Sequence, residues 1–309
     1  MPNSVQLAMG LKIVGYPALV ASGGLVVARL LPAGSRARAA ALALTAAAGL
    51  VTSHVGLAGK PPWPPVDSIG WIPIATLATA LVLALVALVV PARARVAVTG
   101  GLLAIAALAA VYYAGKPTFT RSLDRFWPLA GLTAAGVVAA ATLLPAAGER
   151  SLRPAPWLAW IAVAAGLAGC TLWSHSALLA MLLGSAATTA GVIGIGSAVL
   201  RIRDVGAAPA GVFLVHLAAT AVYAHLYAKL PGWVLATALL AALAPIAIPV
   251  ALGAVPGGAG AGAGAPSTRR RLVAAFVGLV ITAGLTGLAA RRMHAQDAAA
   301  AKDPASMYY

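Results

Sequence analysis

Four histidines lie within or at the ends of long apolar runs, where an imidazole is the side chain best suited to chemistry. His54, His175 and His225 stand at the ends of the second, sixth and eighth runs, and His216 lies near the middle of the eighth. Three imidazoles at one depth could hold zinc or copper, and two could ligate a haem iron. His54, His175 and His225 each belong to a different run, however, so no spacing favours a metal site over interfacial histidines that bond neighbouring loops.

His216 has polar neighbours at helical spacing. On a helix of about 3.6 residues per turn, Thr220, Tyr223 and Tyr227 share its face. Lipid cannot satisfy such a polar stripe, so the stripe must turn toward other helices or toward a water-filled cavity. It predicts either a seam of hydrogen bonds between helices or the lining of a functional cavity. If the protein couples transport to protons, we expect His216 to carry them, because histidine titrates near neutral pH.

The second set of candidate residues is cationic and lies in the loops after and between apolar runs. A lysine at the C-terminal end of a helix is ordinary capping. The alternative is one outward cationic surface that attracts a phosphate, a carboxylate or an anionic lipid headgroup. Its members would be Lys60, Lys116, Arg121, Arg125 and Lys229.

The acidic residues argue against several mechanisms, because pumps and cation-coupled carriers commonly use carboxylates inside the membrane. All six acids fall outside the apolar runs, at Asp67, Asp124, Glu149, Asp204, Asp297 and Asp303. No P-loop, HExxH, GxSxG or CxxCH pattern occurs, and the single Cys170 excludes an intrachain disulfide. The sequence therefore favours a protein that is not an enzyme, and it specifies no cofactor.

Long apolar segments must position these side chains. The chain has 309 residues, of which 61% are hydrophobic and only 9% charged. Because about 20 apolar residues cross a bilayer core, the sequence predicts an all-α, polytopic membrane helix bundle of about ten transmembrane helices. We expect the spans at 13–32, 39–58, 71–91, 96–114, 128–146, 156–173, 176–200, 208–228, 232–253 and 271–289.

These spans divide into two blocks. Residues 1–252 form a nine-span block, and residues 253–270 form a flexible Gly/Ala/Pro linker on the cytoplasmic side. Residues 271–290 form the last transmembrane helix, and residues 291–309 form a polar extracytoplasmic tail. Within the first block, the polar break at 173–176 predicts a tight hairpin. Small residues at 184–197 predict close helix packing or, around Gly194, an unwound segment.

Basic residues give the orientation. Short basic clusters recur on alternate loops, at 36–38, 93–95, 150–153, 201–203 and 269–271. Lys and Arg are retained on the cytoplasmic side, so these loops face the cytoplasm, most simply of a prokaryotic inner membrane, and both termini are extracytoplasmic. The net charge of +15 is thereby explained without a nucleic-acid partner. Tryptophans fit interfacial positions as well, with Trp157 and Trp160 at the inner side.

Three functions remain open. The first is a carrier or channel whose cationic outer vestibule takes an anionic or lipid-like substrate. The second is a non-catalytic subunit of a larger membrane complex, which contacts other subunits through the proline-rich loop 59–71 and the C-terminal tail. The third is an enzyme or redox protein that works at the outer interface with His54, His175 or His225. A histidine cluster would favour the third function, a polar cavity at His216 the first, and a solid apolar core the second.

The predicted orientation can be tested with single cysteines in a Cys170→Ser chain. Cysteines at positions 150 and 201 should resist a membrane-impermeant thiol reagent added from outside, whereas a cysteine at position 63 should react. Labelling of position 150 or 201 from outside would overturn the orientation.

Overall fold

The computed structural model describes residues 4–120, 124, 126–148, 155–174, 176–202, 205–251 and 268–302. Every regular element in these residues is helical, so the predicted all-α bundle is confirmed. The first elements are α1 (Ser4–Gly10), a π-helical turn (Leu11–Gly15), α2 (Tyr16–Leu30), α3 (Arg36–Ala58), α4 (Trp71–Val89), α5 (Ala92–Ala114) and α6 (Lys116–Phe119). There follow α7 (Phe126–Gly148), α8 (Ala155–Trp173), α9 (Ala177–Gly191), a second π-helical turn (Val192–Gly196), α10 (Ser197–Val199), α11 (Ala207–Tyr227), α12 (Gly232–Ala251) and α13 (Thr268–Lys302).

Seven helices among the described residues are long and apolar enough to cross a membrane, which is consistent with an integral membrane protein. They are Ser4–Leu30, Arg36–Ala58, Trp71–Val89, Ala92–Ala114, Pro156–Trp173, Ala177–Val199 and Ala207–Tyr227. The apolar helices Phe126–Ala141 and Gly232–Ala244 are shorter, and α13 is not among the seven. The predicted count of about ten spans is therefore not confirmed.

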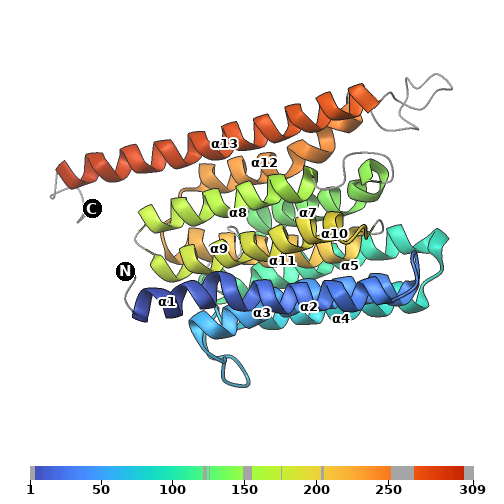
Figure 1. Cartoon of the computed structure of the whole chain (residues 1–309). Coiled ribbons are helices and arrows are strands. Elements are labelled where there is room, and N and C mark those ends of the chain that lie inside the picture. The colour runs from blue at the N-terminus through green and yellow to red at the C-terminus, as the bar shows by residue number, and fades with distance from the viewer. Residues whose placement is uncertain are drawn as a thin grey trace.

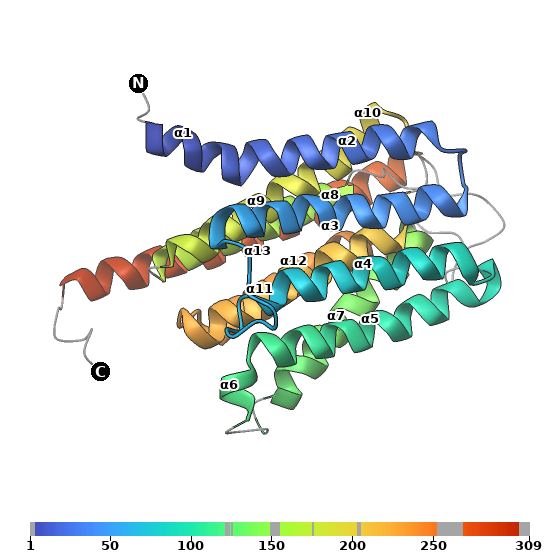
Figure 2. The same cartoon turned by 90° about the horizontal axis from the view of Figure 1, so that it is seen from below.

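The long helices lie side by side along a common direction, with α12 and α13 on one flank and α2 to α4 on the other (Figure 1). Helix α11 runs through the middle, where it packs against α3, α4, α5, α7 and α9 (Figure 2). It is the most buried of the seven apolar helices. Close approach depends on small residues: a Cβ atom at Gly211 would lie 2.6 Å from Leu103 Cδ2 on α5.

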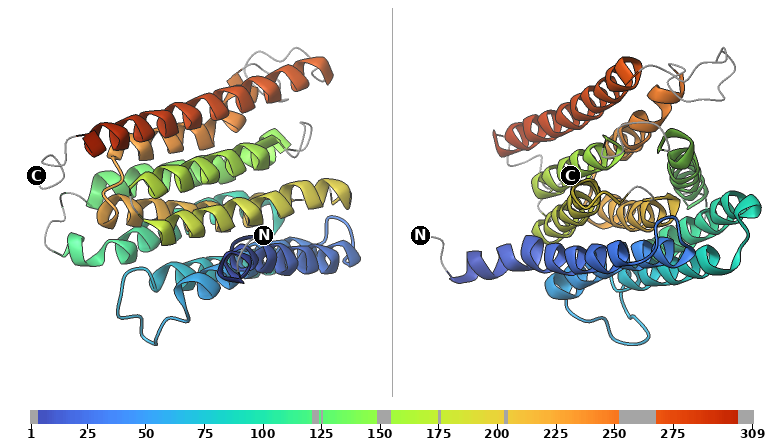
Figure 3. Two further views of the ribbon diagram at one scale, coloured as in Figure 1. Left: turned by 60° about the vertical axis from the view of Figure 1, so that its left-hand side comes forward. Right: turned by 45° about the vertical axis from the view of Figure 1, so that its right-hand side comes forward.

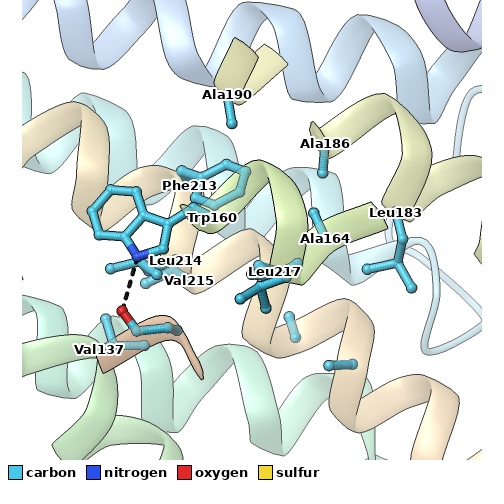
Figure 4. Packing of buried hydrophobic residues seen from close by; sticks show 14 of the residues in the cluster. Val137, Trp160, Ala164, Leu183, Ala186, Ala190, Phe213, Leu214, Val215 and Leu217 are labelled. Carbon is cyan, nitrogen blue, oxygen red and sulfur yellow. Dashed lines mark hydrogen bonds between the residues drawn. The ribbon is translucent and has the colours of Figure 1, made fainter. Parts of the chain in front are cut away.

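The centre of the core joins α8, α11 and α12 through one aromatic pair (Figure 4). Trp160 stacks on Phe213 with ring centroids 6.0 Å apart, and its indole Nε1 donates to the Ala242 carbonyl at 3.0 Å. A buried tryptophan needs such an acceptor for its N–H group. Trp157 and Trp160 are both buried between helices, and their predicted interfacial depth stays a prediction. Together with Phe213, their rings fill the space between these helices.

Arginines cap helix ends at the side predicted to be cytoplasmic. Arg38 is buried and donates to the carbonyl groups of Arg29 and Leu31, where α2 ends. Arg36 Nη1 donates to Leu88 O near the end of α4 at 3.0 Å. The last carbonyls of a helix lack partners within the helix and carry partial negative charge. These arginines therefore stabilise helix ends, whichever side of the membrane they face.

The structure tests local predictions for the hairpin, for Gly194 and for the start of the C-terminal tail. The hairpin at 173–176 is confirmed, since α8 ends at Trp173 and α9 begins at Ala177. Around Gly194 the chain is a π-helical turn and packs closely, because a Cβ atom there would lie 2.4 Å from Trp157 Cβ. Residues 252–267, which include most of the predicted linker, lie outside the described residues. Helix α13 continues to Lys302, so the first part of the predicted polar tail is helical.

The packing of α11 predicts that Gly211→Ala destabilises the protein. The added methyl group meets Leu103, which is fully buried, and overpacking typically costs about 1–3 kcal/mol. Alanine regains only about 1 kcal/mol of helix propensity. Thermal unfolding of the purified protein should show a lower midpoint. The matched control is Gly101→Ala on α5, whose Cβ atom would meet nothing within 4 Å; it should leave the midpoint unchanged or raise it. A Gly211→Ala protein as stable as the control would contradict the packing.

Candidate functional site

Two histidines from helices far apart in the sequence meet in the interior. His54 on α3 and His216 on α11 are each only 1% exposed. Their ring centroids lie 6.3 Å apart, and the ring planes are nearly perpendicular at 87°. His54 is about one turn from the end of α3, whereas His216 is about three turns from the end of α11. The two helix ends are therefore staggered, which is why His54 lies deeper than its position in the sequence suggests.

A threonine from α4 orients one ring of this imidazole pair, by which we mean His54 and His216. Thr76 Oγ1 lies 2.8 Å from His216 Nδ1 and 2.8 Å from the carbonyl oxygen of Ile72. A hydroxyl has a single proton, and the Ile72 carbonyl can only accept it. Thr76 therefore accepts a hydrogen bond from His216, whose Nδ1 must carry the proton. In the neutral ring this leaves the lone pair on Nε2 of His216.

The other ring is less constrained. His54 Nδ1 is buried and has no hydrogen-bond partner in the described structure. A buried polar atom without a partner is costly in an apolar interior. Such atoms call for an explanation, and a bound proton or ligand that completes the site is one.

The predicted polar face of α11 contributes unequally to the site. Thr220 Oγ1 donates to the carbonyl of His216 at 2.9 Å, so it bonds its own helix backbone. Tyr223 and Tyr227 pair with ring centroids 4.6 Å apart, and the second of them is exposed. The face thus runs from the buried imidazole to the surface at the end of α11. Thr76 was missed by sequence reasoning; the only signal was a pair of threonines, at 76 and 79, in an otherwise apolar span.

The loop between α3 and α4 brings the nearest carboxylate. Asp67 interacts electrostatically with His54 and with Tyr223. Its Oδ1 atom accepts a hydrogen bond from Gly70 N at 2.9 Å, which fixes the base of the loop. Next to it, Trp71 stacks on Tyr113 of α5 with centroids 4.4 Å apart. The carboxylate is therefore held by its own loop at the end of the bundle nearest to the imidazole pair.

Three of the five predicted cations lie among the described residues. Lys60, Lys116 and Lys229 are exposed and follow the ends of α3, α5 and α11. Helix α11 contacts both α3 and α5, and the order of the helices places all three ends on the same side of the bundle. Arg121 and Arg125 lie outside the described residues. The prediction of one cationic surface stays a prediction.

Two of the three histidines proposed as metal ligands lie among the described residues, and they have different neighbours. His54 pairs with His216, whereas His225 Nδ1 lies 2.6 Å from the carbonyl oxygen of Leu230 in the following turn. His175 lies outside the described residues. Within the part of the chain that the structure describes, no three side chains of His, Cys, Asp or Glu gather as a metal site would require. The imidazole pair by itself supplies two of the three or four protein ligands that zinc commonly takes.

The structure contains a pocket on the opposite face of α11. It has a volume of about 90 Å³, and its lining from α7, α8, α11 and α12 is apolar except for Thr133. The imidazole pair is not among its lining residues. No family model, curated protein or solved structure matches this chain, so its function must be argued from these groups alone.

The bond from Thr76 to His216 predicts different effects for two neighbouring threonines. Thr76→Val removes the acceptor of a buried N–H group, and an unsatisfied buried donor costs about 1–3 kcal/mol. Thr79→Val, one turn further along α4, removes only a bond to the Ala75 carbonyl. Thermal unfolding should therefore show a larger loss for Thr76→Val than for Thr79→Val. Equal losses would mean that the bond to the imidazole contributes nothing.

Proposed function

We propose that the protein is a proton-coupled membrane carrier of an anionic or lipid-like substrate, with His54 and His216 as its proton-binding site. The observation that carries the proposal is the contact between the two buried imidazoles. Ionisable side chains inside a membrane are costly, and where they occur they mark ion pathways and proton relays. Two such groups in contact, from two different helices, are therefore better explained by proton handling than by packing.

The geometry supports binding of one proton at a time. Two positively charged rings 6.3 Å apart would repel strongly in a medium of low dielectric constant. The lone pair on Nε2 of His216 accepts the proton, while Thr76 holds the opposite side of that ring. Asp67 lies at the outer end of the site, where its negative charge attracts a proton toward His54. The Thr76 hydroxyl donates to a backbone carbonyl, so the path ends there and the site holds a proton without conducting it across.

This arrangement suits a carrier better than a channel. A site that is loaded from one side and closed on the other can couple proton binding to a change of conformation. The predicted cationic surface at the same end of the bundle would raise the local concentration of an anion. Co-transport with a proton would then compensate the charge of that anion.

One observation favours the second candidate function, a subunit of a larger complex. The loop between α3 and α4 projects sideways from the bundle (Figure 3), and it exposes 79% of Trp63 and 87% of Val66. Exposed apolar side chains on a proline-stiffened loop are suited to a protein contact. The C-terminal tail is the other docking segment that the sequence suggests. Isolation of the protein only together with other subunits would favour this function.

The carrier proposal predicts that His216→Gln abolishes proton coupling. Glutamine keeps hydrogen-bonding capacity but cannot take up a proton near neutral pH. Uptake of inorganic phosphate, succinate and lysophosphatidylglycerol should be measured in proteoliposomes with and without a pH gradient. The native protein should accumulate at least one of these anions when the gradient is imposed, and His216→Gln should not respond to the gradient.

The matched control for this experiment is His225→Gln, which alters a histidine on the same helix away from the imidazole pair. It should leave gradient-driven uptake intact. Full gradient-driven uptake by His216→Gln would overturn the role of the imidazole pair. If the native protein takes up none of the three anions, the carrier proposal itself fails.

A further inference from the structure

We propose that the pocket between α7, α8, α11 and α12 binds the hydrocarbon chain of a single-chain anionic amphiphile, whose headgroup is held by Lys229. The pocket is a substrate site only if the protein is a carrier, so this proposal rests on the proposed function. It depends on three observations: the lining of the pocket, its position along the helices and the backbone conformation of Lys229.

The lining determines the kind of ligand. Leu129, Val137, Leu167, Ala218 and Ala238 are typical of the seventeen lining residues, of which only Thr133 is polar. Such a pocket offers no partner for a polar group, so a polar ligand would lose its hydration without compensation. Its volume of about 90 Å³ is below the several hundred Å³ of sites for drug-sized ligands. The apolar lining suits a stretch of hydrocarbon.

The pocket lies toward one end of the bundle. Its lining residues from α7 and α12 fall in the first two thirds of those helices, and its residues from α11 fall in the last two thirds. The starts of α7 and α12 and the end of α11 meet at the end of the bundle that carries the exposed lysines. Lys229 stands in the turn that joins α11 to α12, two of the helices that line the pocket. An amphiphile whose hydrocarbon chain lies in the pocket would therefore place its headgroup near this lysine.

The conformation of Lys229 is unusual for a lysine. Its φ angle is +54°, in the left-handed region that glycine occupies at the ends of many helices. The turn around it is the usual helix ending, with Ala228 N and Leu230 N both donating to Ala224 O at 2.9 and 3.2 Å. A residue with a side chain is strained there. Glycine would adopt this backbone conformation without strain, whereas the ammonium group adds a positive charge that a bound headgroup could use.

The two observations together select an anionic amphiphile. The pocket accounts for a hydrocarbon chain, and the strained, exposed lysine in the adjoining turn between α11 and α12 accounts for a phosphate or carboxylate headgroup. A neutral hydrocarbon would make no use of the lysine, and a small inorganic anion would make no use of the pocket.

The experiment measures binding alone, without a pH gradient. The purified protein in neutral detergent is titrated with 9,10-dibromostearate, and quenching of the tryptophan fluorescence gives the affinity. Ala218→Phe fills the pocket and should weaken binding about tenfold or more, the loss expected when about two methylene groups lose their burial. Ala238→Phe fills it from α12 and provides a second variant if the first does not fold. Ile105→Phe, on a lipid-facing position of α5 that is 64% exposed, is the control and should bind like the native chain.

Lys229 gives a second, independent readout. Lys229→Gly should raise the midpoint of thermal unfolding, because it relieves the strained backbone, and at the same time weaken binding of dibromostearate, most at low salt. Lys229→Gly with unchanged affinity would overturn the headgroup site. Quenching that is not saturable, or that Ala218→Phe leaves unchanged, would show that bulk acyl chains merely fill the pocket, and the proposal would fail.

Binding of dibromostearate and gradient-driven uptake test the ligand site and the carrier function separately. His216→Gln should bind dibromostearate like the native protein, since the imidazole pair lies on the other face of α11. Saturable binding without gradient-driven uptake would therefore retain the ligand site and reject the carrier, and uptake without such binding would do the opposite.

Discussion

The structure depends on one constraint, which is that a hydrocarbon environment offers no partner to a polar group. The chain meets it by turning hydroxyl groups back onto their own helices. Thr45, Thr79 and Thr189 each donate to the carbonyl group four residues earlier. Side chains that behave in this way leave the surfaces between helices apolar, so helices can pack wherever their shapes match. Against this background a polar contact between helices, such as that of Thr76 with His216, is conspicuous.

The same constraint explains how much the sequence could predict. Helical class and the position of most helices follow from runs of apolar residues, because each run must satisfy its backbone internally. The hairpin at residue 173 follows from the only polar break in its run. The number of spans was harder, since composition does not decide whether a helix such as α13, with arginines near both ends of its apolar stretch, crosses a membrane or lies elsewhere.

The candidate site was only half visible in the sequence. His216 stood out because an ionisable group in the middle of a span is rare, and its position could be inferred from one helix. Its partners could not, because His54 and Thr76 come from other helices and their approach depends on the stagger between helix ends. Sequence periodicity describes the faces of each helix separately. Periodicity does not show how far one helix is shifted along its axis relative to another. The shift between α3 and α11 is what brings their histidines to one depth.

Alanine at about half of the buried apolar positions has a consequence for the evolution of this protein. Ala43, Ala186 and Ala210 are fully buried and give the helices flat surfaces that touch along much of their length. Two rigid cylinders in such contact cannot yield at one point alone, so a single bulkier side chain would separate them over several turns. Selection at these positions would therefore act on side-chain volume more strongly than on polarity. Serine would be accepted there more readily than leucine, even though leucine is the more hydrophobic residue.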